Sequence, residues 1–151
     1  MRAAQCFDAG HHLAAIERRE VLLLERNELG TGASARAAGL IVPLRAGASE
    51  RWIVAQTLAA FRTLPAASFR QVGALHVAAS AESEKMLHAL SAEAADICTW
   101  MSRDEVKPLV PWLDATATTK LLFVPQGGYV DPYLATMAYA QAARSAGATL
   151  R

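Results

Sequence analysis

The segment VLLLERNELGTGASARAAGLI, residues 21–41, carries the clearest structural signal in this chain. It begins with a continuous apolar run, Val21–Leu24, which is typical of a strand covered on both faces in a parallel sheet. Glu25 follows at the end of that run. In dinucleotide-binding folds an acidic residue at this place can accept hydrogen bonds from both hydroxyls of an adenosine ribose. The pattern therefore favours an α/β fold with a nucleotide site at the end of this strand.

A long small-residue loop follows the strand. Residues 30–39 read GTGASARAAG, with three glycines, many backbone N–H groups and one cation, Arg36. Because little side-chain bulk keeps a ligand away, such a loop can closely approach a pyrophosphate and a flat ring. The same segment then continues into the apolar residues Leu40 and Ile41, which predict a short extended piece.

Three stretches of this sequence resemble one family, the FAD-dependent amine and amino-acid oxidoreductases that include D-amino-acid oxidase, glycine oxidase and the sarcosine and dimethylglycine oxidising enzymes. The first stretch is the strand with Glu25, Arg26 and residues 32–41. The second is GGYVDP, residues 127–132, which resembles the family's G-x-V-D-P turn and the helix after it. A weaker match, GALHVA at residues 73–78, resembles a strand of the substrate domain. The three stretches keep the family's order and roughly its spacing.

The resemblance implies an α/β fold with an incomplete Rossmann-type FAD-binding portion and part of a second, mixed β-sheet substrate domain. It implies FAD as cofactor and oxidation of a C–N bond of an amino acid or N-methyl amine by hydride transfer to the flavin. The expected partner is thus a small-molecule amine or amino acid. The family pattern assigns cofactor binding to Glu25, Arg26, Gly32, Ala33, Ser34, Arg36, Gly39 and Leu40. No catalytic residue is identified.

Chain order gives the expected organisation. Residues 1–48 are predicted to be a partial FAD-binding portion and residues 49–126 a partial substrate domain. Residues 127–151 are predicted to be a helix returning to the FAD-binding portion, capped by Asp131 with Pro132 in the first turn. Further elements are expected as helices at 9–19, 50–64 (capped by Ser49), 81–97 and, after a turn and a Ser102 cap, within 99–113. Strands are expected at 69–79 and 120–125, paired with each other.

One family feature is missing from the sequence. The Gly-rich G-x-G-x-x-G turn should lie about 18 to 24 residues before the acidic residue, yet residues 1–7, MRAAQCF, contain no glycine. The family also commonly needs a longer chain, which suggests an N-terminal portion or a gene fragment. The alternative function is therefore a catalytically inactive fragment or an accessory, interacting subunit, with oligomers favoured by uncovered sheet edges. A nicotinamide-binding domain fits the loop less well.

Composition excludes several other classes. The chain has 151 residues, 53% hydrophobic and 19% charged, so a buried core is expected. A net charge of +1 gives no electrostatic basis for nucleic-acid binding. No apolar run is long enough for a transmembrane segment or a signal peptide. Two cysteines without paired spacing favour a reduced, cytoplasmic protein.

Other polar residues give weaker signals. The four histidines have no metal-ligand spacing, so no metal site is predicted. Arg45 follows the short extended piece and can be interpreted either as a partner for a substrate carboxylate or as a solvated loop arginine. Tyr129 and Tyr133 can be interpreted as active-site or as core aromatic residues.

Overall fold

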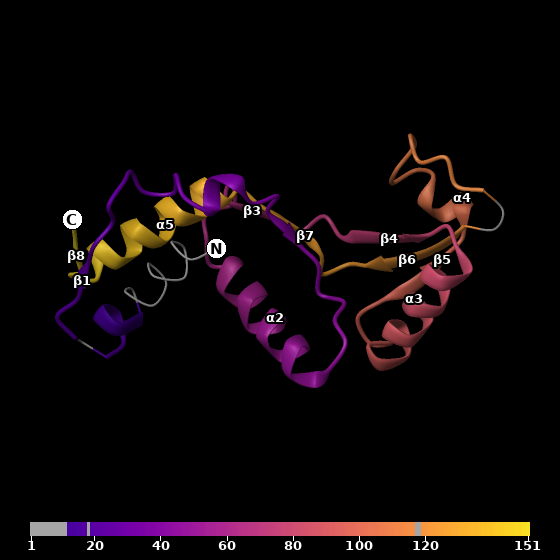
Figure 1. Cartoon of the computed structure of the whole chain (residues 1–151), viewed down its shortest axis with the longest axis horizontal. Helices are drawn as coiled ribbons and strands as arrows, with labels where there is room; N and C mark the ends of the chain where they lie inside the picture. Colours follow the sequence, from indigo (N-terminus) through magenta and orange to yellow (C-terminus); the bar gives the residue numbers. More distant parts are fainter. Residues whose placement is uncertain (1–11, 18, 117–118) are drawn as a thin grey trace. The chain divides into compact units, whose positions relative to one another are not determined.

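The computed structural model describes residues 12–17, 19–116 and 119–151. The chain divides into two compact units, each described here by itself (Figure 1). The first unit contains Met1–Leu40, Ala60–Arg70 and Tyr129–Arg151, and the second contains Ile41–Ala59 and Gln71–Gly128. Helices and strands follow one another through both units, so the predicted α/β class is confirmed. The domain boundaries at residues 48 and 126 stay a prediction.

The first unit is built on a pair of parallel strands, β1 (Leu22–Leu23) and β8 (Thr149–Leu150). The ladder extends on both sides of the assigned strands. The Thr149 N–H donates to the Val21 carbonyl at 2.9 Å, and the Glu25 N–H donates to the Arg151 carbonyl at 2.8 Å. The parallel pairing predicted from the apolar run is thus confirmed, and it fixes Glu25 beside the end of β8.

Only one face of β1 is covered, which corrects the prediction of a strand buried on both faces. Leu23 packs against the helix α5 (Pro132–Ser145) and against β8. Leu22 and Leu24 point the other way and are 56% and 76% exposed. Alternate residues of a strand point to opposite faces, so a second layer is needed to bury this pair, and the described residues supply none.

Helix α5 (Pro132–Ser145) covers the other face of the pair. It begins as predicted, because Asp131 Oδ1 accepts hydrogen bonds from the N–H groups of Tyr133 and Leu134, both at 2.9 Å. Pro132 occupies the first turn, where its missing N–H is not needed. The buried face contains five residues: Ala135, Thr136, Tyr139, Ala140 and Ala143.

A small sheet of order β2-β7-β3 follows the glycine-containing loop. Its strands are β2 (Leu40–Ile41), β7 (Gly128–Val130) and β3 (Phe69–Arg70), and Phe69 pairs antiparallel with Val130. The sequence predicted only a turn at 126–131. A three-residue strand is too short to show the alternation that identifies strands, and β7 was missed for this reason.

The second unit is built on the antiparallel sheet β4-β6-β5. Its strands are β4 (Ala74–Ala78), β6 (Lys120–Val124) and β5 (Thr99–Met101), and the predicted pairing of β4 with β6 is confirmed. β5 lies where the sequence predicted a turn. The predicted strand 69–79 is two strands, separated by Gly73, whose φ of +85° bends the chain.

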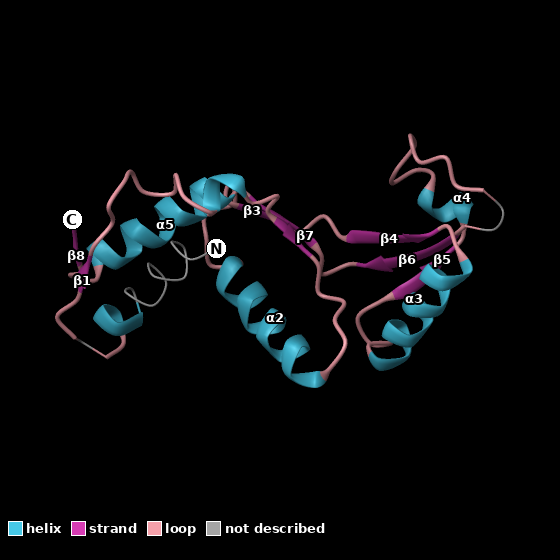
Figure 2. Ribbon diagram, viewed as in Figure 1, coloured by secondary structure: helices cyan, strands magenta, loops and turns pink. Residues whose placement is uncertain are grey.

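Both faces of this sheet are covered. Leu122 and Val124 pack with α3 (Ala81–Glu93) and Leu44 on one face. On the other face Leu121 packs with α4 (Arg103–Val106) and the loop after it. Figure 2 shows these strands and helices.

Local capping agrees with the sequence at one helix and not at another. The Ser102 side chain caps α4, and Glu105 completes a capping box, as in the predicted Ser102 cap. Ser80 and Ser83 form a second capping box at α3. The predicted Ser49 cap is wrong, because α2 (Ala48–Phe61) already includes Ser49. The i, i+3, i+4 spacing of apolar residues in this helix predicts a buried stripe, but of its residues only Leu58 is buried.

Residues 12–15 are helical, and residues 16–17 and 19 are not, so the predicted helix 9–19 ends earlier than expected. The remainder of that prediction before residue 12, and the window 1–7 in which a Gly-rich turn was expected, lie outside the described residues. No helix in the described part of the chain is both long and apolar enough to span a bilayer.

Candidate functional site

A cavity of about 390 Å³ opens at the carboxyl ends of β1 and β8. Its wall contains Leu23 and Glu25 from β1 and its extension, and Leu150 and Arg151 from β8. The remaining lining residues come from the loop after β1 and from α5: Asn27, Glu28, Leu29, Tyr133, Met137 and Arg144. Ligands of open α/β sheets bind outside the carboxyl ends of parallel strands, and this cavity occupies that place.

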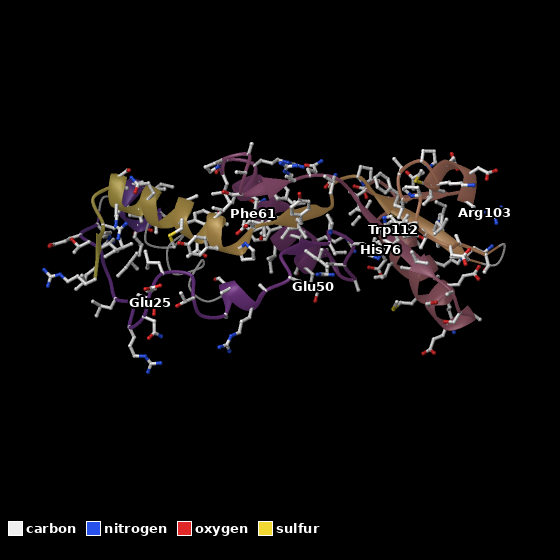
Figure 3. The ribbon with its side chains drawn as sticks, turned by 90° about the horizontal axis from the view of Figure 1, so that it is seen from above. Glu25, Glu50, Phe61, His76, Arg103 and Trp112 are labelled. Carbon is white, nitrogen blue, oxygen red and sulfur yellow. The ribbon has the colours of Figure 1, made fainter. Side chains whose placement is uncertain are left out.

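Glu25 is one of two carboxylates on this wall, with Glu28, and it is the one that stands at the end of β1 (Figure 3). Its Oε1 accepts a hydrogen bond from the Asn27 N–H at 3.0 Å, which fixes the carboxylate at the strand end. A carboxylate has about four lone-pair sites, so this one bond leaves acceptor capacity toward the cavity. Glu25 therefore has acceptor capacity for hydroxyl groups, and its part in cofactor binding stays a prediction.

The glycine-containing loop runs along the start of α5. At Gly30 a Cβ would lie 3.0 Å from the Tyr133 ring, so the loop backbone is in close contact with the helix. Residues Ser34–Arg36 form a short 3-10 helix, η1, that packs against α5. Gly32 has open space around it, and Ala33 and Arg36 are exposed. The loop thus presents small side chains and one cation to its surroundings.

Gly39 ends the loop in a conformation that other residues adopt at a cost. Its φ is +70°, and a Cβ there would collide with the Val130 carbonyl oxygen. The Gly39 carbonyl accepts a hydrogen bond from the Val130 N–H at 2.8 Å. This contact joins the two sequence motifs, because Val130 immediately precedes the Asp131 cap of α5.

Ser34 has an unusual environment. Its side chain is 2% exposed, and Oγ has no hydrogen-bond partner among the described residues. Buried hydroxyls are nearly always hydrogen-bonded, and an unpaired one costs about 1–3 kcal/mol. An orphaned hydroxyl within a loop suited to a phosphate or a flat ring indicates a donor and acceptor available to a ligand.

The structure brings the predicted residues to one unit but not to one cavity. Glu25 lines the cavity, Ser34 lies buried at α5, and Gly39 lies at β7. Arg26, Arg36 and Leu40 are exposed. Of the α5 residues on this wall, the sequence named Tyr133, as an active-site or core aromatic residue, but missed Met137 and Arg144. Their spacing along the helix was visible, but only the parallel pairing of β8 with β1 places that helix over Glu25.

Two histidines of the second unit, His76 and His88, lie in environments that affect their side chains. Burial lowers the pKa of His76, and the Arg45 guanidinium lowers it further. His76 Nε2 is buried without a partner among the described residues. His88 stacks on Trp100 with ring centroids 4.5 Å apart. No cluster of metal-ligating side chains occurs in the described parts of the chain, and the prediction that there is no metal site remains untested.

A parallel strand pair with a helix over one face and an acidic side chain at the strand end is an arrangement that dinucleotide-binding α/β proteins contain. Residues 9–151 match the family described as DAO, FAD dependent oxidoreductase. The chain belongs to this FAD-dependent oxidoreductase family, as the resemblance in the sequence implied.

Similar proteins agree with this assignment. The chain is 32% identical over 149 residues to a 4-methylaminobutanoate oxidase (formaldehyde-forming) of Paenarthrobacter nicotinovorans, covering 93% of this chain and 18% of that protein. It is 27% identical to the mitochondrial dimethylglycine dehydrogenase of Homo sapiens, with 93% and 17% covered. The chain therefore spans less than a fifth of the length of these curated relatives.

Solved structures show the same fold. L-proline dehydrogenase from P. horikoshii superposes with a TM-score of 0.83 at 23% identity, covering 95% of this chain and 40% of that one. Glycine oxidase from Geobacillus kaustophilus gives 0.79 at 24% identity, with 96% and 43% covered. At these identities the likeness concerns the fold alone, and it confirms the predicted α/β architecture.

The family's cofactor is FAD, and the donor set in the first unit fits it. Glu25 has spare carboxylate acceptors on the cavity wall, and the Ser34 hydroxyl has no hydrogen-bond partner among the described residues. Arg36 adds a cation to the same loop. Each of these groups matches a chemical feature of a flavin dinucleotide.

Proposed function

We propose that this chain forms the adenosine-binding and flavin-facing part of an oxidoreductase that oxidises a C–N bond of an amino acid or an N-methyl amine. The observation that carries the proposal is the cavity at the carboxyl ends of β1 and β8, with Glu25 on its wall. The names of the similar proteins, an oxidase of a methylamino acid and dimethylglycine dehydrogenase, support this substrate class.

In this proposal each residue has a defined part. Glu25 accepts the ribose hydroxyls, and Arg26 lies beside the adenine. The loop Gly32, Ala33, Ser34 and Arg36 holds the pyrophosphate and the ring edge, and the backbone at Gly39 and Leu40 lies beside the flavin ring. When bound, FAD supplies the hydride acceptor, while the protein orients its substrate.

Flavin retention by residues 1–151 tests the proposal. The purified chain is mixed with FAD, excess FAD is removed, and the visible flavin absorbance that stays with the protein is measured. Glu25→Gln removes charged hydrogen bonds and should weaken FAD binding by about tenfold or more. Glu50→Gln, at the start of α2, is the matched control and should bind FAD as the original chain does. A folded chain that retains no FAD contradicts the proposal.

An accessory, interacting subunit is the second candidate, and one observation favours it. Leu22 and Leu24 form an apolar face of β1 that is uncovered within the described residues. Contiguous exposed apolar surface commonly marks a protein–protein contact. Sedimentation of Leu24→Lys against the original chain separates the candidates: if the original self-associates and the variant does not, while neither retains FAD, the subunit function is favoured.

A cytoplasmic location is also proposed from the cysteines. Cys98 is a free thiol, and burial raises its pKa, followed by a smaller effect of Asp96. A thiol with a raised pKa is little ionised and reacts slowly, so Cys98 is a structural thiol, and the proposed location rests on the absence of paired cysteine spacing in the sequence. Fractionation of the source cells tests this location.

A further inference from the structure

A second cavity, of about 350 Å³, lies in the second unit between α4 and the loop that follows it. Its residues come from the segment 103–115, and none of them lines the cavity at Glu25. Val106 and Ala115, 2% and 6% exposed, provide buried apolar lining, with Val110 and Leu113 beside them. The volume lies within the range of small-molecule sites, about 300–1,000 Å³. We call it the α4 cavity.

The charges on the α4 cavity are mostly positive. Arg103 and Lys107 line it together with a single carboxylate, Asp114. Arg103 Nη1 donates to the Ala115 carbonyl at 3.4 Å, a long hydrogen bond that occupies one of its five donors. The other Arg103 donors and the Lys107 ammonium group are suited to an anion such as a carboxylate.

Trp112 adds an aromatic wall to the same cavity. Its side chain is 83% exposed, the largest exposure among the large hydrophobic residues of the described chain, and it lies in the second unit with Arg103 (Figure 3). An exposed indole ring does not gain the favourable free energy that burial of its apolar surface would give. A ligand with a flat apolar body would recover that free energy by stacking on the ring.

From this arrangement we propose that the α4 cavity binds a small carboxylate with a flat apolar body, held through Arg103 and Lys107 and stacked on Trp112. This site is independent of the proposed flavin function, because it uses none of the residues assigned to FAD. The two cations favour a ligand with a negative charge, and Trp112 favours one with an aromatic or planar group. A ligand with only one of these properties would contact only part of the cavity wall.

Phenylacetate is a direct probe, with neutral phenylacetamide as its matched control compound. The indole N–H signals of the full chain are followed by two-dimensional NMR during titration, and the Trp112 signal is identified with Trp112→Phe. Phenylacetate should shift the Trp112 signal in a saturable way and leave Trp52 and Trp100 unchanged. Phenylacetamide should bind about tenfold more weakly, because it lacks the charge.

Charge variants decide between a built site and unspecific stacking. Lys107→Glu should abolish saturable phenylacetate binding, and Lys107→Arg should retain it. Lys85→Glu, at an exposed position on α3, changes the net charge equally and should bind phenylacetate as the original chain does. Equal shifts from the acid and the amide, equal loss in Lys107→Glu and Lys85→Glu, or shifts of all three tryptophans would each overturn the proposal.

Discussion

Two apolar runs of equal length, Val21–Leu24 and Leu121–Val124, differ in how far their side chains are buried. The second run lies in β6, which has a strand on each side and cover on both faces, and Leu121, Leu122 and Val124 are each at most 2% exposed. The first run lies at β1, whose one partner strand among the described residues is β8, and Leu22 and Leu24 are exposed. The same sequence pattern therefore specifies a strand but not the number of layers around it.

The largest expected difference between the two runs concerns stability. Leu122→Ala removes a fully buried side chain and should lower the free energy of unfolding by about 2–5 kcal/mol. Leu24→Ala changes an exposed side chain and should have an effect within about 0.5 kcal/mol. Urea denaturation followed by circular dichroism measures both. Equal losses would mean that β1 is covered in solution.

Gly39→Ala, in the first unit, should have the next largest effect on stability. The substitution forces a Cβ into the left-handed region and against the Val130 carbonyl, so it should cost about 1–3 kcal/mol in stability. Gly47 has a φ of +74° but open space, so Gly47→Ala isolates the backbone strain from the collision. If both variants lose the same stability, the close approach of Gly39 to Val130 is not tight in solution.

Ser34→Ala should separate stability from ligand binding. Because Oγ has no partner among the described residues, its removal should leave stability unchanged or slightly raise it, while FAD retention falls. Ser91 is also buried, but it donates to the His88 carbonyl at 3.1 Å. Ser91→Ala should therefore lose about 1 kcal/mol and keep FAD. If Ser34→Ala loses stability as Ser91→Ala does, or retains as much FAD as Ser91→Ala, a ligand role for Ser34 is contradicted.

The smallest expected effect is a pH dependence in the second unit. Glu93 accepts hydrogen bonds from the Gly47 N–H at 3.2 Å and from Arg51 Nη1 at 3.1 Å, and these, in that order, lower its pKa below the ordinary value of 4.5. The stabilisation is present above that ordinary value and is lost as pH falls through the lowered one. Glu93→Gln should flatten the fall of the melting temperature in acid, whereas Glu82→Gln should not.

Much of the fold follows from local sequence chemistry. The Asp131–Pro132 helix start and the Ser102 cap were predicted because capping residues act over short distances. The pairing of β4 with β6 joins strands far apart in sequence, and it was expected from the family resemblance rather than from a local pattern. β5 and β7 were missed because three-residue strands have no measurable period and are defined by their partners. The exposure of Leu22 and Leu24 was not predictable either, since it depends on layers far away in sequence.

The candidate site was predictable in its chemistry more than in its geometry. Glu25 and the glycine-containing loop follow a recognisable pattern, so their types of contact could be foreseen. Met137 and Arg144 are ordinary helical residues, and only the pairing of β8 with β1 places them on the cavity. The α4 cavity had no sequence signal, because its charges are spread across a helix and an irregular loop.

The pairing of Leu22 with Thr149 has a consequence for biosynthesis. β1 emerges from the ribosome early, but its partner is made only after the entire second unit. Contacts between residues distant in sequence form slowly, whereas the capped helices and antiparallel strands of the second unit can form while synthesis continues. During that interval β1 lacks its partner β8 and is an apolar segment that chaperones can bind or that can aggregate.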